Sequence, residues 1–204
     1  MRKALIVDDH PVVRTAVRMT LEAERFTVIY ETSNGNEVLS LIREHRPQLV
    51  VLDLRLPFLD GLEVLSRINA GNFGCRVLVF SSQEPLHYQS RCLSHGAMGY
   101  VCKNQPIEQL RKAVQAVMSG YSYFSALPDP GSSLACEKHL IDQLSDRELS
   151  IFEQLAHGKT NTAIADDMHL SHKTVSTYKT RMMKKLGVAA TVHLRDFAKR
   201  NHLI

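Results

Sequence analysis

Several features of exported and membrane proteins are missing from this sequence. No apolar run approaches the ~18–20 residues that a helix needs to cross a bilayer. The N-terminus leads directly into a strand pattern, without the charged and apolar regions of a signal peptide. The four cysteines show neither paired nor metal-binding spacing, which favours free thiols in a reducing compartment. We therefore expect a cytoplasmic protein without a membrane partner.

Negative charge is missing from one long stretch. The formal net charge of the 204 residues is only +4, but His172–Leu186 contains five lysines and arginines and no acidic residue. Solvated helix faces often carry charges of one sign, yet a basic face is also a candidate contact for a polyanion. The five cations are Lys173, Lys179, Arg181, Lys184 and Lys185.

The first 120 residues alternate between short apolar runs and amphipathic segments. We expect strands at 4–7, 27–30, 49–52, 77–80 and 99–102. We expect a first helix that begins at Pro11 and further helices at 36–44, 62–68, 86–94 and 106–119. Five such alternations predict a parallel sheet with helices on both faces, which is the flavodoxin-like (βα)5 arrangement of the α/β class.

Carboxylates follow two of these strands. Asp8 and Asp9 come directly after the first, and Asp53 comes directly after the third. The carboxyl ends of parallel strands meet at one rim, so three carboxylates are brought together and repel one another. A Mg²⁺ ion, which prefers oxygen ligands, would relieve that repulsion. The pattern predicts a Mg²⁺ pocket in which Asp53 is a nucleophile for a phosphoryl group. We expect His10 to close the adjoining turn rather than to bind metal.

The remaining strand ends supply polar groups that suit this chemistry. Lys103 follows the fifth strand and is placed to balance charge on phosphoryl oxygens, and Ser81 at the fourth strand offers a hydroxyl. Tyr100, beside Lys103, is placed to swing inward when Ser81 moves toward the phosphate. Taken singly, such residues are more often a surface lysine, a turn hydroxyl and a half-buried aromatic. Their positions relative to Asp53 favour the functional interpretation.

The alternating pattern stops near Tyr121, and residues rich in Pro, Gly and Ser follow. We expect a linker at 123–140 and then a small all-α domain of four helices. The first begins at a capping box formed by Ser145 and Glu148, and the second covers 160–168. The third is capped by Ser171 and ends at Gly187, and the fourth covers 191–200. A basic helix that follows a short helix and a tight turn indicates a helix-turn-helix.

Residues 1–120 resemble the receiver domain of bacterial two-component response regulators. The residues that carry the resemblance are Asp8-Asp9, Asp53, Leu56-Pro57, Asp60-Gly61, Ser81, Tyr100 and Lys103. The resemblance implies that a sensor histidine kinase or another phosphodonor modifies Asp53. It implies that the backbone carbonyl of Arg55 completes the Mg²⁺ site of Asp8, Asp9 and Asp53. It also implies that Ser81 and Tyr100 couple phosphorylation to the face of the fourth helix, fifth strand and fifth helix.

Residues 141–204 resemble the LuxR-type helix-turn-helix, with Leu144-Ser145, Arg147-Glu148, Gly158-Lys159, Asn161, Ile164-Ala165, Leu170-Ser171, Thr174-Val175 and 185–188 as the matching residues. A receiver followed by this module is the NarL/FixJ class, and 173–179 is most similar to its BvgA/EvgA branch. By that resemblance, hydroxyls on the third helix face bases and cations hold phosphates. The implied DNA-binding residues are Lys173, Thr174, Ser176, Thr177, Lys179, Thr180, Arg181 and Lys184.

The leading hypothesis is a phosphorylation-controlled transcription regulator with a receiver at 1–122 and a DNA-binding domain at 141–204. We expect a homodimer on promoter DNA, and no enzyme activity beyond the receiver's own phosphorylation and dephosphorylation. One alternative is a Mg²⁺-dependent phosphohydrolase with an aspartyl nucleophile, although haloacid-dehalogenase-type phosphatases place both carboxylates on one strand as Asp-x-Asp. Another is a phosphorylation-independent binding platform, against which the complete acidic pocket argues.

Overall fold

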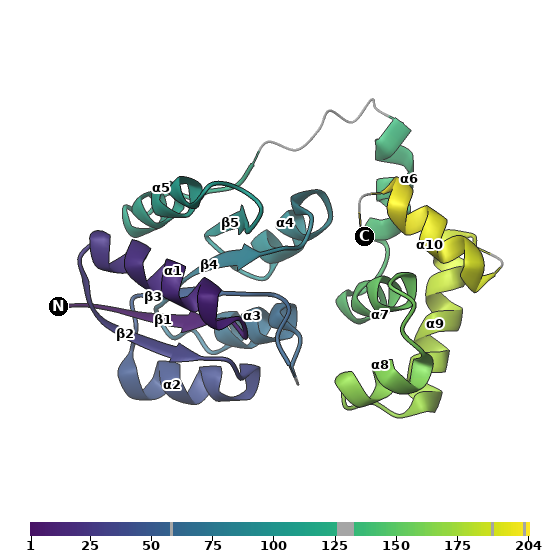
Figure 1. Ribbon diagram of the computed structural model, residues 1–204, viewed down its shortest axis with the longest axis horizontal. Helices are drawn as coiled ribbons and strands as arrows, with labels where there is room; N and C mark the ends of the chain where they lie inside the picture. Colours follow the sequence, from purple (N-terminus) through teal and green to yellow (C-terminus); the bar gives the residue numbers. More distant parts are fainter. Residues whose placement is uncertain (58, 126–132, 189, 202) are drawn as a thin grey trace. The chain divides into compact units, whose positions relative to one another are not determined.

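The computed structural model describes residues 1–57, 59–125, 133–188, 190–201 and 203–204 (Figure 1). The chain divides into two compact units, Met1–Ala126 and Leu127–Ile204. Among the described residues, no helix combines the length and the apolar character needed to cross a membrane.

The first unit is a five-stranded parallel sheet with the strand order β2-β1-β3-β4-β5. Its strands are β1 (Arg2–Val7), β2 (Phe26–Thr32), β3 (Leu49–Leu52), β4 (Arg76–Ser81) and β5 (Gly99–Cys102). Its helices are α1 (Pro11–Ala23), α2 (Val38–His45, after the 3-10 turn η1 at Gly35–Glu37), α3 (Gly61–Ala70), α4 (Pro85–Ser94) and α5 (Ile107–Met118). Helix α1 packs beside α5, whereas α3 contacts both α2 and α4 (Figure 1). The predicted flavodoxin-like fold is confirmed.

The short apolar runs form strands because the sheet is covered on both faces. All four residues of β3 are buried, and so are residues 4–7 of β1. On one face, Ile6 and Val51 of the sheet meet Val17 of α1 and Val114 of α5. Burying one such aliphatic side chain contributes about 1.5–3 kcal/mol. This continuous packing holds the strand ends, and the polar residues that follow them, in a fixed arrangement.

The edge of β5 is covered by the chain that returns from α5. The backbone N–H of Tyr100 donates to the carbonyl of Tyr123 at 2.8 Å, and the N–H of Tyr123 donates to the carbonyl of Met98 at 2.9 Å. Gln89 of α4 then holds the backbone of Ser125 through both ends of its side-chain amide, at 2.7 and 2.9 Å. Residues 123–125 were expected in the linker, but here they satisfy the backbone groups that an open sheet edge exposes.

The second unit contains α6 (Ser133–Asp142), α7 (Asp146–Ala156), α8 (Asn161–Asp167), α9 (His172–Leu186) and α10 (Thr191–Arg200). The four expected helices are α7–α10, and the predicted capping box of Ser145 and Glu148 starts α7. Helix α9 ends at Leu186, and Gly187 caps it with a φ of +66°, which suits glycine. Buried Leu149, Phe152, Ile164, Val175, Met182, Leu194 and Phe197 contribute to the core of this unit.

Helix α6 lies where the sequence predicts a linker. Glu137 on α6 hydrogen-bonds to Asn201 and Arg200 at the end of α10, and Ile141 is fully buried. These contacts attach the segment to the helical domain, and no local sequence pattern predicts them. The rest of the expected linker, residues 126–132, lies outside the described residues. Cys75, Cys92 and Cys102 are free thiols, as expected, whereas the side chain of Cys136 lies outside the described part.

Candidate functional site

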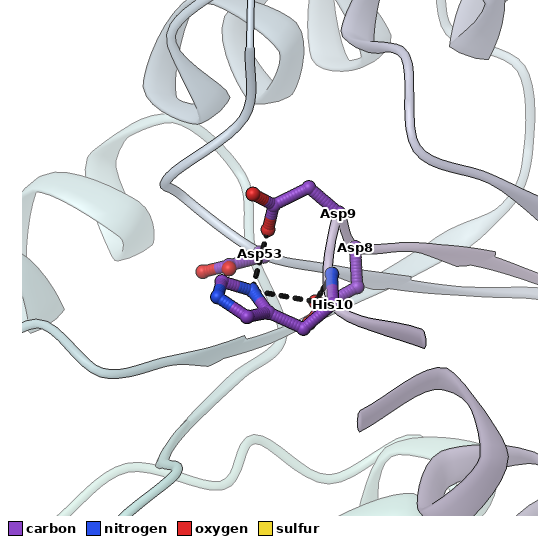
Figure 2. Close-up of side chains that lie close together, drawn as sticks. All are labelled: Asp8, Asp9, His10 and Asp53. Carbon is purple, nitrogen blue, oxygen red and sulfur yellow. Dashed lines mark hydrogen bonds and ion pairs between the residues drawn. The ribbon is translucent and has the colours of Figure 1, made fainter. Parts of the chain in front are cut away.

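The predicted site residues meet at the carboxyl-end rim of the sheet. Asp8 and Asp53 follow the neighbouring strands β1 and β3, whose last residues Val7 and Leu52 are paired in register. Ser81 ends β4, and Lys103 follows β5. Figure 2 shows the side chains of Asp8, Asp9, His10 and Asp53 gathered at this rim. The parallel topology therefore brings together residues from four strand ends.

Asp53 is at the centre of the hydrogen bonding in this site. It is 2% exposed, and its Oδ2 accepts a hydrogen bond from the Lys103 ammonium at 2.6 Å. Its Oδ1 accepts from the Ser81 hydroxyl at 2.7 Å and from the backbone N–H of Arg55 at 3.2 Å. The Lys103 Nζ also lies 2.6 Å from the Oδ2 of Asp8. One ammonium therefore joins two buried carboxylates.

Burial and charge act in opposite directions on these groups. Burial raises the pKa of Asp8, more than the hydrogen bond from Lys103 lowers it. Burial alone would lower the pKa of Lys103, but the carboxylates of Asp53 and Asp8 outweigh that effect and raise it. Lys103 therefore stays charged. Because it faces a pair of carboxylates, with Asp9 close by, the rim retains negative charge that a cation would neutralise.

The donor set fits a hard divalent cation. One ligand atom from each of Asp8, Asp9, His10 and Asp53 lies within 4.8 Å of the others. Three of these ligands are carboxylates, which suit Mg²⁺. The backbone N–H of His10 donates to the Oδ1 of Asp8 at 2.9 Å, in keeping with the expected turn-closing role. The His10 Nδ1 also lies 2.6 Å from the Oδ1 of Asp9.

Tyr100 and Arg55 meet at a residue that the sequence did not point to. Tyr100 is 1% exposed, and its hydroxyl donates to the backbone carbonyl of Gln83 at 2.8 Å. The ring is therefore already inward, and Ser81 is already on Asp53, whereas the sequence interpretation had the ring swing in. The Nε of Arg55 donates to the side-chain oxygen of Gln83 at 3.0 Å. Gln83 thus links the β4–α4 connection to both residues, although no motif marks it.

The predicted DNA-binding residues lie along α9, away from its buried side. Val175, Met182 and Leu186 are buried, as expected. Thr174 and Lys179 are partly exposed, and the other six predicted residues are exposed. The hydroxyls of Thr177 and Thr180 donate to the carbonyls of Lys173 and Ser176 at 2.9 and 3.0 Å. Their hydroxyl hydrogens are therefore engaged within the helix, which leaves the oxygens of these exposed residues as acceptors.

One cation of the basic stretch has a different role. The Nζ of Lys185 lies 2.5 Å from the Oε2 of Glu148 and donates to the carbonyl of Gln143 at 3.1 Å. Burial opposes the ionisation of Glu148, but hydrogen bonds from Lys185 and Ser145 outweigh it and lower its pKa. Lys185 thus ties α9 to α7. Lys185 is one of the five cations of the basic stretch, but it is not among the predicted DNA-binding residues.

Comparisons with known proteins agree with this geometry. The response regulator receiver domain family matches residues 4–115, and the luxR family of bacterial regulatory proteins matches residues 142–198. The chain is 48% identical over 205 residues to the virulence-factor transcription regulator BvgA of Bordetella pertussis, covering 98% of each chain. The chain belongs to the NarL/FixJ class of two-component response regulators. The resemblance seen in the sequence is confirmed.

Two further relatives of this response regulator are informative. The DNA-binding transcriptional activator EvgA of Escherichia coli K12 is 31% identical, with 98% of each chain covered. A solved complex of the response regulator RcsB with DNA is 26% identical, with a TM-score of 0.59 over 97% of this chain and 98% of that one. The similarity to all three proteins extends over both domains.

Proposed function

We propose that Asp53 accepts a phosphoryl group from a sensor histidine kinase or a small phosphodonor, and that this controls promoter binding by α9. The observation that carries the proposal is the pairing of buried Asp53 with Lys103 and Ser81, beside Asp8. Asp8, Asp9, Asp53 and the backbone carbonyl of Arg55 would hold Mg²⁺. When bound, the ion would neutralise charge on the phosphoryl oxygens.

The residues of this rim suit a simple displacement. One carboxylate oxygen of Asp53 attacks phosphorus, and the bond from phosphorus to the donor's leaving group breaks as that group departs with the electron pair. Lys103 turns from the carboxylates toward a phosphoryl oxygen, and Ser81 donates its hydroxyl hydrogen to another. Hydrolysis of the resulting acyl phosphate returns Asp53 and inorganic phosphate. The receiver therefore acts on itself rather than on an external substrate.

The contacts around Ser81 offer a route for the signal. When Ser81 changes partner from the Asp53 carboxylate to the phosphoryl group, β4 and the connection to α4 are held differently. A shift of that connection would also move Tyr100, because the Tyr100 hydroxyl donates a hydrogen bond to the carbonyl of Gln83. A two-state receiver biased in this way would change the DNA affinity of the second domain.

For DNA binding, the proposal rests on α9 and on the named relatives. Its exposed face combines cations for phosphates with hydroxyls for base edges. EvgA is named as a DNA-binding activator, and RcsB is solved on DNA. A homodimer would place two α9 helices on half-sites related by two-fold symmetry.

Phosphorylation and footprinting of the full chain test the proposal together. Acetyl phosphate and Mg²⁺ should give a phosphorylated band on a phosphate-affinity gel, and the phosphorylated protein should alter the footprint on promoter DNA. Asp53→Ala should remove the band, whereas Asp167→Ala in α8 should keep it. Continued labelling of Asp53→Ala would exclude Asp53 as the acceptor. Multiple turnovers on small phosphate esters would favour the phosphohydrolase alternative.

A further inference from the structure

A side chain from α1 reaches the backbone of the acidic pocket. The NH1 group of Arg14 donates to the backbone carbonyl of Asp8 at 2.8 Å. That carbonyl belongs to the peptide that joins Asp8 to Asp9. The backbone of Arg14 lies in the first turns of α1, where its N–H donates to the carbonyl of His10 at 3.1 Å, so the base of this side chain is fixed.

The orientation of this peptide matters more for Asp9 than for Asp8. Asp8 is secured by Lys103, by the N–H of His10 and, through its own N–H, by the carbonyl of Thr32 at 3.1 Å. The Asp9 side chain is 37% exposed, and its Oδ1 lies 2.6 Å from the Nδ1 of the exposed His10 ring. A peptide unit is planar, so fixing the Asp8 carbonyl fixes the adjoining N–H and Cα of Asp9. The point at which the Asp9 side chain leaves the backbone is thereby fixed, which narrows the positions open to its carboxylate.

Glu31 holds Arg14 in place and offers a matched comparison. The Nε of Arg14 lies 3.2 Å from one carboxylate oxygen of Glu31, and the Nε of Arg18 lies 2.7 Å from the other. Arg18 then donates to the carbonyl of Ile29 at 3.3 Å. Both arginines therefore share one carboxylate and come from one helix, but Arg18 donates to a backbone carbonyl of β2 rather than to one at the pocket.

We propose that Arg14 is a positioning residue that orients the Asp8–Asp9 peptide so that Asp9 presents its carboxylate to a divalent cation. The inference rests on the proposed cation site. The positive charge of Arg14 makes the positioning role testable, because a guanidinium near a cation site repels the ion. Loss of charge alone would tighten cation binding, whereas loss of positioning weakens it. The two effects have opposite signs.

Calorimetric titration of the full-length protein with MgCl₂, without a phosphodonor, measures the effect directly. Removal of a group that orients a metal ligand costs about 10–100-fold in metal affinity. We expect Arg14→Ala to weaken Mg²⁺ binding about tenfold. Arg18→Ala, which removes the same charge and the other contact with Glu31, should bind Mg²⁺ as well as the wild type or slightly better. Arg14→Lys should recover part of the loss.

Unfolding by urea, followed by circular dichroism, is the control for folding. Both alanine variants lose one contact with Glu31 and should lose similar stability. If Arg14→Ala does not fold, the Mg²⁺ affinities of Arg14→Lys and Arg18→Lys can be compared instead, because both variants retain the positive charge. Equal Mg²⁺ affinity in the Arg14 and Arg18 variants, or tighter binding by Arg14→Ala, would overturn the inference while leaving the cation site intact. A wild-type protein that binds no Mg²⁺ would overturn the proposed site itself.

Discussion

Adjacent lysines on α9 should respond in opposite ways to the same substitution. Lys185 bonds Glu148 of α7 and the carbonyl of Gln143, whereas Lys184 lies on the exposed face predicted to contact DNA. We expect Lys185→Met to destabilise the helical domain without changing the salt dependence of DNA binding. Lys184→Met should do the reverse. Methionine keeps most of the aliphatic stem, so the comparison isolates the ammonium.

The size of the effect follows from the burial of the pair. The Glu148 side chain is only 4% exposed, so loss of Lys185 leaves a buried carboxylate that accepts hydrogen bonds from the backbone N–H and the hydroxyl of Ser145. Removing one partner of a buried pair costs about 3–5 kcal/mol. Because the Lys185 side chain is 38% exposed, solvent screens the charge and the cost is smaller. We expect a loss of about 2 kcal/mol, or roughly 8–16 °C in Tm for a domain of this size.

The stability lost in Lys185→Met should depend on pH in a defined direction. The pKa of Glu148 is lowered in the folded protein, so the ionised form stabilises the fold. That contribution is fully present above the unfolded-chain pKa of about 4.3. It disappears as the pH falls through the lower, folded-state pKa. The difference between wild type and Lys185→Met should therefore be largest near neutral pH and should shrink in acid.

Two assays separate the lysines. Urea unfolding followed by circular dichroism gives the stability of each variant. Fluorescence anisotropy with labelled promoter DNA at several salt concentrations gives the slope of log K for DNA binding against log salt concentration. Lys184→Met should reduce that slope by about 0.9 and leave stability within about 0.5 kcal/mol. An unchanged stability for Lys185→Met, together with a reduced slope, would show that Lys185 contacts DNA and that its pairing with Glu148 is unimportant.

Three further predictions concern the receiver. A Cβ on Gly61 would lie 2.4 Å from the Leu54 Cα and 2.5 Å from the Asp53 carbonyl oxygen, so Gly61→Ala should cost about 1–3 kcal/mol in urea unfolding. Unaltered unfolding would disprove that close approach. Arg55→Ala should shorten the lifetime of the phosphorylated protein, since we expect the Arg55 side chain to shield the phosphoryl group from water; an equal lifetime would remove that role. Burial raises the pKa of the Cys75 and Cys102 thiols, so both should react with iodoacetamide at pH 8 more slowly than free cysteine, and equal rates would contradict their burial.

The parts of the site that the sequence predicts are those that local patterns and sheet topology determine. An apolar run that ends in Asp53 is visible without a structure, and the crossover rule places Asp8 beside it. The same reasoning brings in Ser81 and Lys103. The capping box at Ser145 is equally local, because both partners lie within four residues.

The contacts that the sequence does not reveal are those between distant polar residues. Gln83 is one of four glutamines in connections between elements, and it matters because Tyr100 and Arg55 converge on it in space. The partner of Lys185 becomes visible only when the fold brings Glu148 of α7 beside it. The strand-like segment at Tyr123 depends on an unpaired edge of β5, which a linear pattern does not show. Helical and strand periods predict which face is buried, but not which polar group is its partner.

The strand order has a consequence for synthesis on the ribosome. Asp8 and Asp53 emerge early in translation and lie on neighbouring strands, but their shared counter-charge, Lys103, follows the last strand of the sheet. A nascent chain that stops short of β5 would bring two carboxylates together without the ammonium that joins them. Mutual repulsion should then disfavour a partly assembled sheet, so that a receiver becomes competent for phosphorylation only after its full length has been translated.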